Sequence, residues 1–315
     1  MSMYLVTGGA GFIGSNIVDE LLRRGHSVRI VDNMSTGREE NIEGFKDDVE
    51  FLRSDICDAE AVDRAVRGVD YVLHQAALAS VPRSIADPTA NNQVNVQGTL
   101  NLLQSATRHD VRGFVYASSS SVYGDSEVLP KVESMTPSPR SPYAVAKLAA
   151  EYYCGVFSAL HGLPTVSLRY FNVFGPRQDP NSQYSAVIPI FISAIIEGRS
   201  ATIHGDGEQS RDFTYISNVV DANLRAAEAG FDGAKVYNIA CGERFTLNHL
   251  YASLRKKLGS DVEPQYGPAR AGDVKHSMAG IASISGELGF RPEVDFEEGI
   301  DRTVAWYQKR ASRRP

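Results

Sequence analysis

The chain has 315 residues, of which 43% are hydrophobic and 22% are charged, a composition that is ordinary for a globular protein. This length exceeds one ordinary domain, so we expect two lobes or one enlarged α/β unit. The formal net charge of −6 argues against nucleic acid or an anionic membrane as the main partner, and no apolar run approaches the ~20 residues of a membrane span.

The first predicted strand begins at Tyr4 and runs into a glycine-rich turn and then a helical pattern. Gly8 and Gly11 let the backbone turn tightly and approach a pyrophosphate, and Gly14 allows close packing of the helix. The N-terminus of that helix offers free N–H groups to an anion. Strand, turn and helix together predict a dinucleotide-binding site.

A second predicted strand, 27–31, ends in Asp32 and Asn33. An acidic side chain about twenty residues after the glycines accepts hydrogen bonds from the adenosine ribose and repels a 2′-phosphate. The sequence therefore favours NAD over NADP.

Strand-like runs then alternate with amphipathic helical runs. This alternation predicts an α/β fold built on a Rossmann-type doubly wound parallel sheet. Ligands bind at the carboxyl ends of such strands, where residues 55–56, 74–77 and 118–119 fall. The strand-like runs are 49–52, 71–73, 113–117 and 165–168, and the helical runs include 59–66 and 96–107.

A tyrosine and a lysine farther along the chain can form a general base. Tyr143 and Lys147 are four residues apart and share one face of a predicted helix. A tyrosine titrates near ~10 in water, so it removes protons at neutral pH only where nearby positive charge stabilises the phenolate. A hydroxyl from the serine run 118–121 would share the proton, as alcohol oxidation requires. The Tyr-x-x-x-Lys spacing alone is common on solvated helices. The dinucleotide-binding motif at the start of the chain is what favours a catalytic role for this pair.

After residue 175 the chain becomes rich in turns, which predicts a smaller α/β substrate-binding lobe interleaved with the first. The substrate would lie in the cleft between the two lobes. The expected boundaries are 1–171 for the NAD-binding domain, with 214–241 returning to it, and 172–213 with 242–315 for the substrate-binding lobe.

The remaining signals concern compartment and metals. Cys57, Cys154 and Cys241 lie far apart and are interpreted as reduced packing residues. The seven histidines lack metal-ligand spacing, so no metal is expected. The N-terminus leads into a strand without a signal peptide, and we expect a cytoplasmic protein with no membrane partner.

In combination, the motifs resemble those of the extended short-chain dehydrogenase/reductase family, and more narrowly its nucleotide-sugar 4-epimerases. The resemblance covers essentially the whole chain, and it implies a tightly held NAD, a UDP-sugar substrate and usually a homodimer formed by two helices from each subunit. The motifs that carry it are 7–14, 74–77, Tyr143 with Lys147, 168–175 and 270–273.

The serine run helps to identify the reaction. The related 4,6-dehydratases carry an acid pair or a glutamate where this chain has Ser120 and Ser121, and the decarboxylases usually carry a glutamate at Ser121. The absence of both carboxylates favours 4-epimerisation through a 4-keto intermediate. The resemblance then implies that Tyr143 takes the 4-hydroxyl proton, Lys147 lowers the tyrosine pKa, and Ser119 shares the proton while hydride passes from C4 to NAD.

The resemblance also implies two sets of binding residues. Arg211 and Arg270 would bind the diphosphate, Asn172 the diphosphate or the sugar, Asp273 the uridine ribose, and the backbone at 186–187 the uracil. The expected cofactor-binding residues are Gly8, Gly11, Phe12, Ile13, Gly14, Asp32, Asn33, Asp55, Ile56, Gln75, Ala76, Ala77, Asn95, Ser118, Tyr143, Lys147 and Tyr170. The expected substrate-binding residues are Ser80, Ser119, Ser120, Asn172, Ala186, Val187, Thr202, His204, Arg211, Arg270, Asp273 and Ser277.

Ser277 bears on the choice of sugar. Epimerases restricted to glucose and galactose carry a bulky tyrosine four residues after the aspartate of the Arg-x-Gly-Asp motif, and here that position is Ser277. A small residue leaves room for a 2-acetamido group, and segment 178–189 also resembles the acetamido-sugar epimerases. This favours interconversion of UDP-N-acetylglucosamine and UDP-N-acetylgalactosamine, with plain sugars also possible as substrates.

Three alternatives stay open at this point. They are a UDP-glucose 4-epimerase restricted to plain sugars, a UDP-glucuronate 4-epimerase, and a non-catalytic NAD-binding regulator, since this fold hosts such proteins. The residues do not choose among polysaccharide biosynthesis, glycolipid synthesis and galactose catabolism as the pathway.

Overall fold

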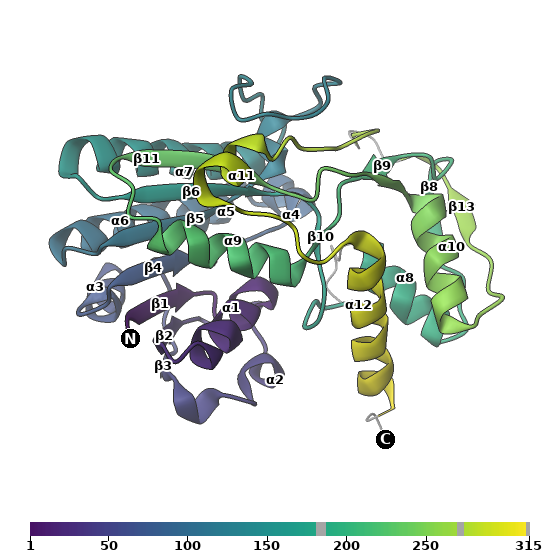
Figure 1. Cartoon of the computed structure of the whole chain (residues 1–315), viewed down its shortest axis with the longest axis horizontal. Coiled ribbons are helices and arrows are strands. Elements are labelled where there is room, and N and C mark those ends of the chain that lie inside the picture. Colours follow the sequence, from purple (N-terminus) through teal and green to yellow (C-terminus); the bar gives the residue numbers. More distant parts are fainter. Residues whose placement is uncertain (181–186, 270–273, 313–315) are drawn as a thin grey trace.

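A computed structural model of the chain describes residues 1–180, 187–269 and 274–312. Its larger part is a seven-stranded parallel sheet with the strand order β11-β6-β5-β4-β1-β2-β3 (Figure 1). This order confirms the predicted Rossmann-type doubly wound sheet. The strands are β1 (Met3–Thr7), β2 (Ser27–Val31), β3 (Glu50–Leu52), β4 (Tyr71–His74), β5 (Gly113–Ser119), β6 (Thr165–Tyr170) and β11 (Ala234–Ile239).

Helices cover both faces of the sheet because its strands are apolar on both sides. One face packs against α1 (Phe12–Arg23) and α9 (Ile216–Glu228), and the other against α3 (Ala59–Val66), α6 (Gly98–Arg108) and α7 (Pro142–His161). Shorter helical segments connect these elements: α2 (Glu39–Ile42), η1 (Lys46–Asp48), α4 (Val81–Ala86), α5 (Pro88–Asn92), η2 (Gln93–Gln97) and η3 (Ser120–Tyr123).

The smaller lobe lies to the right of the sheet in Figure 1. Its helices α8, α10 and α12 pack around short strand pairs, and β8 and β13 pair in parallel. The elements of this part are β7 (Val173–Phe174), α8 (Val187–Ile196), β8 (Thr202–His204), β9 (Ser210–Arg211), β10 (Thr214–Tyr215), β12 (Phe245–Thr246), α10 (Leu247–Leu258), β13 (Gln265–Gly267) and α12 (Phe296–Ala311). The helix α11 (Ala282–Leu288) lies instead beside β11 of the large sheet (Figure 1).

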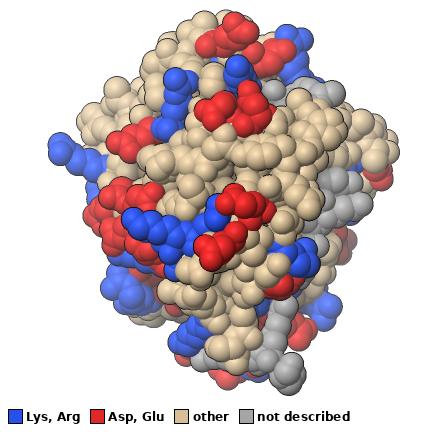
Figure 2. Space-filling model, turned by 90° about the vertical axis from the view of Figure 1, so that its right-hand side faces the viewer, with Lys and Arg blue, Asp and Glu red and all other residues tan. Residues whose placement is uncertain are grey.

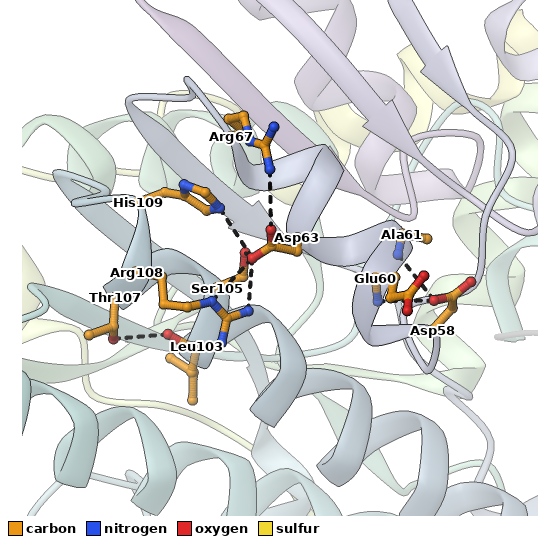
Figure 3. Close-up of polar contacts among 10 residues, drawn as sticks. All are labelled: Asp58, Glu60, Ala61, Asp63, Arg67, Leu103, Ser105, Thr107, Arg108 and His109. Carbon is orange, nitrogen blue, oxygen red and sulfur yellow. Dashed lines mark hydrogen bonds and ion pairs between the residues drawn. The ribbon is translucent and has the colours of Figure 1, made fainter.

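Polar side chains fix α3 against the end of α6 (Figure 3). Asp58 caps α3 by accepting hydrogen bonds from the backbone N–H groups of residues 60 and 61, at 3.0 and 3.1 Å. Asp63 accepts hydrogen bonds from Arg108 at 2.8 Å and from His109 at 3.1 Å, and these bonds hold its pKa below the ordinary value. The predicted helix 59–66 is confirmed, and this cluster explains how it holds its place beside α6.

The charges on the surface of the smaller lobe alternate in sign. Figure 2 shows Lys and Arg side chains lying beside Asp and Glu side chains on the face that forms the right-hand side of Figure 1. Between α10 and α12, Lys257 lies 3.0 Å from Glu297 and 2.6 Å from Asp301. Among the helices of the described ranges, none is both long enough and apolar enough to cross a membrane.

Candidate active site

The glycine-rich turn places the N-terminus of α1 beside the loop that follows β4. Gly8 has a φ of +69°, and a Cβ there would lie 2.8 Å from the backbone nitrogen of Ala76. A Cβ on Gly14 would lie 2.2 Å from the Gly8 carbonyl oxygen, so the helix packs against the turn only because this residue is glycine. Gly11 occupies the N-cap position of α1 but has no side chain that could bond the free N–H groups of the first helical turn. Residues of this turn line the cavity described below.

Asp32 closes the other side of this region at the end of β2. Its carboxylate accepts hydrogen bonds from the backbone N–H groups of Ala10 at 3.0 Å and Met34 at 2.8 Å. Burial nevertheless raises the pKa of Asp32. The neighbouring Asn33 donates to Asp55 at 2.8 Å, which links the ends of β2 and β3.

A cavity of about 240 Å³ lies over these strand ends. Twelve of the residues expected to bind the cofactor line it: Gly8, Gly11, Phe12, Ile13, Gly14, Asp32, Asn33, Asp55, Ile56, Gln75, Ala76 and Ala77. Sequence reasoning missed Ser35, Thr36, Ser54, Leu78, Ala79 and Val94, which also line it. Ser35 and Thr36 had a signal, because they follow directly on the acidic residue at the end of β2.

The donor set of the cavity fits NAD. An uncapped helix N-terminus suits a pyrophosphate, and the carboxylate of Asp32 suits the hydroxyls of an adenosine ribose. A second cavity of about 720 Å³ shares Gly11, Phe12, Ser35 and Thr36 with the first. The two cavities together extend the space available to a dinucleotide.

A buried row of hydrogen bonds fixes the loop after β4. His74 contacts Thr7 at 2.7 Å and Thr99 at 2.9 Å, and burial lowers the pKa of the imidazole to about 3. Asn95 accepts from the N–H of Leu78 at 2.9 Å and donates to the carbonyl of the same residue at 3.2 Å. Asn95 is therefore bonded to the loop that forms the cavity wall and does not line the cavity itself.

Tyr170, another of the expected cofactor residues, has its hydroxyl in a buried polar group. It donates to Gln75 Oε1, 3.1 Å away, and accepts from the side-chain amide of Asn223 at 2.8 Å. Burial raises the Tyr170 pKa above its ordinary value. The described contacts thus place Tyr170 behind Gln75, which lines the cavity.

The start of α7 carries the tyrosine and the lysine. Ser141 caps this helix by accepting from the Ala144 N–H at 3.2 Å, and Ser84 of α4 accepts from the N–H of Tyr143 at 3.1 Å. One turn on, the ammonium nitrogen of Lys147 lies 5.9 Å from the centre of the Tyr143 ring. Both residues are thus brought together on one face of α7, as the spacing predicted.

The serine run lies at the end of β5. Hydrogen bonding to Ser119 lowers the pKa of Tyr143, although burial raises it by more. Ser119 Oγ also accepts from the N–H of Ser121 at 3.2 Å and from its hydroxyl at 2.9 Å. Ser118 faces elsewhere and donates to the buried Glu151 at 2.9 Å. The run thus provides one hydroxyl beside the tyrosine, and that hydroxyl belongs to Ser119.

Burial lowers the pKa of Lys147 to about 7. Its ammonium donates to the carbonyl of Ala117 on β5 at 2.8 Å. Glu151, one turn farther along α7, has its carboxylate paired with Arg169 at 2.5 Å. The arrangement places a proton acceptor, a proton-sharing hydroxyl and a cation within one buried cluster, which is what general acid–base chemistry on an alcohol needs.

A third cavity, of about 550 Å³, lies in the smaller lobe. Of the residues expected to bind the substrate, Asn172, Val187, Thr202, His204 and Arg211 line it. Further residues that line this cavity were not predicted from the sequence, because no local pattern marks them, and they include Phe191, Glu197, Arg199, Gln209 and Phe213.

The other expected substrate residues that the structure describes are not among those lining this cavity. Ser80 lines the 720 Å³ cavity, on the side near the glycine turn. The N–H of Ser277 donates to the Ser210 carbonyl at 3.0 Å, which places Ser277 beside the start of β9. Ser120 begins the short helix after β5. Ala186, Arg270 and Asp273 lie outside the described residues.

Comparison with known proteins gives matches that cover most or nearly all of the chain. Residues 4–240 match the model of the NAD dependent epimerase/dehydratase family. A protein of Methanocaldococcus jannaschii named putative UDP-glucose 4-epimerase is 38% identical over 306 residues, which are 96% of this chain and 98% of that protein.

Two solved structures are similar over nearly their whole length. One is the UDP-N-acetylglucosamine 4-epimerase of Methanobrevibacter ruminantium in complex with UDP-N-acetylmuramic acid, with 43% identity, a TM-score of 0.94, and coverage of 98% of this chain and 99% of that one. The other is the UDP-glucose 4-epimerase of Thermotoga maritima with UDP-glucose, with 39% identity, a TM-score of 0.93 and the same coverage.

Proposed function

The chain belongs to the NAD dependent epimerase/dehydratase family, and from this membership we propose that it is a UDP-sugar 4-epimerase acting on UDP-N-acetylglucosamine and UDP-N-acetylgalactosamine. The observation that carries the proposal is the cluster of Tyr143, Lys147 and Ser119 at the carboxyl end of β5. The residues that would hold NAD are those lining the cavity above the glycine turn, with Asp32 at the ribose.

The chain's own residues would move one proton. Tyr143 accepts the proton of the sugar 4-hydroxyl, and Ser119 shares that proton through its hydrogen bond with the tyrosine. The charge of Lys147 stabilises the phenolate, and the same tyrosine returns the proton when the hydroxyl re-forms on the other face of the sugar. When bound, NAD supplies the reversible hydride acceptor that epimerisation through a 4-keto sugar requires.

The serine run supports epimerisation over elimination of water. A dehydratase of this kind needs a further acid and base next to the sugar, and positions 120 and 121 are serines here. Ser121 instead donates to Ser119 at 2.9 Å and so supports the proton-sharing hydroxyl.

The choice of an acetamido sugar rests on Ser277 and on the similarity to the Methanobrevibacter enzyme. A serine at this position leaves volume for the acetamido group. A second candidate, a UDP-glucose 4-epimerase, is favoured by the names of the Methanocaldococcus and Thermotoga relatives. Both candidates use the same acid–base residues, and the sugar pocket would discriminate between them.

We further propose that the protein is cytoplasmic and that its two lobes have the boundaries predicted from the sequence. We also propose that it forms a homodimer through α4 and α7. Helix α7 exposes a stripe of apolar side chains, including Tyr152 at 59% and Leu160 at 72%, and α4 beside it exposes Ile85 at 64%. A stripe at 3–4-residue spacing is typical of a helix face that packs against a partner.

The test is separation of UDP-sugars by capillary electrophoresis after incubation of the purified protein with UDP-N-acetylglucosamine or UDP-glucose, without added NAD. Preferential conversion of the acetamido sugar to its 4-epimer is the expected result. Conversion of UDP-glucose alone would instead establish the second candidate. The Tyr143→Phe protein serves as the control for the chemistry, because loss of one acid–base group lowers rates by about 100-fold or more.

A further inference from the structure

Residues 176–179, here called the strap, follow β7 in the smaller lobe and lie against the cofactor-binding half of the molecule. Arg177 makes the main contacts. Its guanidinium donates to the carbonyl of Ser15 at 2.8 Å and to the carboxylate of Asp19 at 2.7 Å, both on α1. It also lies 5.6 Å from the centre of the Phe45 ring. Helix α1 is the helix whose N-terminus faces the predicted pyrophosphate site.

The backbone of the strap is strained at the residue that makes these contacts. Arg177 has a φ of +71°, in the left-handed region that side chains other than glycine rarely adopt. Such a conformation persists only where surrounding interactions hold it. The three contacts of the guanidinium supply those interactions.

Three further bonds fix the rest of the strap. The side chain of Asn16 on α1 donates to the Pro176 carbonyl at 3.2 Å. Arg38, in the loop after β2, donates to the carboxylate of Asp179. On the outer side, the Tyr307 hydroxyl of α12 donates to the carbonyl of Gln178. The strap is therefore bonded to α1, to the loop after β2 and to α12.

Three residues of the strap, Arg177 to Asp179, line the 720 Å³ cavity together with the start of α1. This cavity shares Gly11 and Phe12 with the smaller one, so it opens onto the uncapped helix N-terminus. Its charged lining residues are three arginines and one aspartate: Arg38, Arg83, Arg177 and Asp179. Arg38 and Arg177 are paired with the carboxylates of Asp179 and Asp19, so only part of this positive charge is available to the two negative charges of a dinucleotide pyrophosphate.

We propose that the strap retains NAD by closing the solvent side of the pyrophosphate site, and that Arg177 is the positioning residue that holds it closed. NAD then leaves only when the bonds from Arg177 to α1 break. On this proposal, the bonds between the strap and α1 keep the cofactor with the protein between turnovers. They add to the contacts that the residues at the strand ends make with the cofactor.

The experiment measures NAD exchange in the holoenzyme. Purified holoenzyme is desalted and mixed with an excess of isotopically labelled NAD, and bound label is followed with time in the absence of any sugar. Arg177→Gly is the main variant, because glycine adopts the positive φ without strain and lacks the side chain that makes the contacts with α1. We expect exchange to be about ten-fold or more faster than in the wild type, equivalent to ~1.4 kcal/mol.

Asp19→Asn is the second variant. Asp19 does not line either cofactor cavity and is bonded to Arg177 at 2.7 Å, so faster exchange in this variant is expected to act through Arg177 and the strap. The control is Arg302→Ala, which removes a similar ion pair, with Glu298 at 2.6 Å, and a similar ring contact, with Tyr215, on α12.

Unchanged exchange in both Arg177→Gly and Asp19→Asn would overturn the proposal, and so would equally fast exchange in Arg302→Ala. If Arg177→Gly fails to fold, Asp19→Asn decides alone. Because no sugar is present, the result does not depend on the proposed epimerase activity: a protein that exchanges NAD as expected but converts no UDP-sugar would refute only the proposed function.

Discussion

The ammonium of Lys147 lies 5.9 Å from the centre of the Tyr143 ring, and both side chains project from the first turns of α7 toward the end of β5. Burial raises the pKa of Tyr143 and lowers that of Lys147 to about 7. The phenolate therefore depends on a cation that is fully charged only below neutral pH. This coupling gives the first prediction.

In Lys147→Met, the pKa of Tyr143 is expected to rise because the nearby positive charge is lost, and one pKa unit corresponds to ~1.4 kcal/mol. The acidic limb of the pH profile of kcat should move to higher pH, and the titration near pH 7 from Lys147 itself should disappear. Steady-state kinetics across pH measure both effects. Lys257→Met, on α10, is the control, and an unmoved acidic limb in Lys147→Met would contradict the assigned role.

The buried pair of Glu151 and Arg169 gives a prediction for stability. Their side chains are 3% and 4% exposed, and Arg169 also donates to the Tyr123 hydroxyl at 2.9 Å. Arg169→Met leaves a buried carboxylate without its cation, which is expected to lower the free energy of unfolding by about 3–5 kcal/mol. Urea denaturation measures this loss. The double variant Arg169→Met/Glu151→Leu should lose less, and a larger loss in the double variant would refute the ion-pair explanation.

The exposed stripe on α7 gives a prediction for assembly. Introducing charge with Tyr152→Glu and Leu160→Glu should shift the sedimenting species from a dimer toward a single 34.3 kDa chain. The matched control is Tyr266→Glu on β13, since Tyr266 is 58% exposed against 59% for Tyr152. Analytical ultracentrifugation makes the comparison. A wild-type protein that sediments as a monomer would remove the basis for the proposed dimer.

Asp212 connects the lobes and should make stability depend on pH. Its fully buried carboxylate accepts backbone N–H bonds from Cys241, Gly242 and Ala279 at 2.9–3.2 Å, yet burial outweighs these bonds and raises its pKa to about 6. The folded state thus binds a proton between about pH 4 and pH 6 that the unfolded chain has released. The contribution of Asp212 to the free energy of unfolding is therefore largest below about pH 4, and it is lost as the pH rises through about 6.

The measurement is the difference in unfolding free energy between the wild type and Asp212→Asn at several pH values. The wild-type advantage should shrink by about 3 kcal/mol from pH 4 to above pH 6, because the two pKa values differ by about two units. Asp206→Asn is the surface control. A difference that stays constant with pH would mean that Asp212 is ionised throughout this range.

The fold was predictable because its signals are local. Residues 59–66 have a helical pattern after a capping aspartate, and the strand-like run at 71–73 matches β4. The strands β5 and β6 extend two residues beyond the predicted ends, since their last residues include polar side chains that only the neighbouring helix and strand bury. Periodicity in the sequence does not report such tertiary burial.

The site was predictable in part for the same reason. Glycines and Asp32 act through backbone geometry and position along the strands, which the spacing reveals. The pairing of Glu151 with Arg169, and the bonds from Arg177 to α1, join residues far apart in the sequence. Only the folded chain brings such partners together, so no local pattern marks them.

The last prediction concerns the size of the sugar pocket. Ser277→Tyr places a bulky ring at the position where epimerases restricted to plain sugars carry tyrosine, so we expect kcat/KM for UDP-N-acetylglucosamine to fall about 10- to 100-fold relative to UDP-glucose. Ser277→Ala, which keeps the volume, is the matched control and should retain the wild-type preference. The N–H of residue 277 donates to the Ser210 carbonyl at 3.0 Å, and this backbone bond is available to either substituent. Competition between the two UDP-sugars in one reaction measures the ratio directly. If the ratio is the same in the tyrosine variant as in the wild type, Ser277 does not set the sugar preference, and the choice of acetamido sugar must depend on other residues.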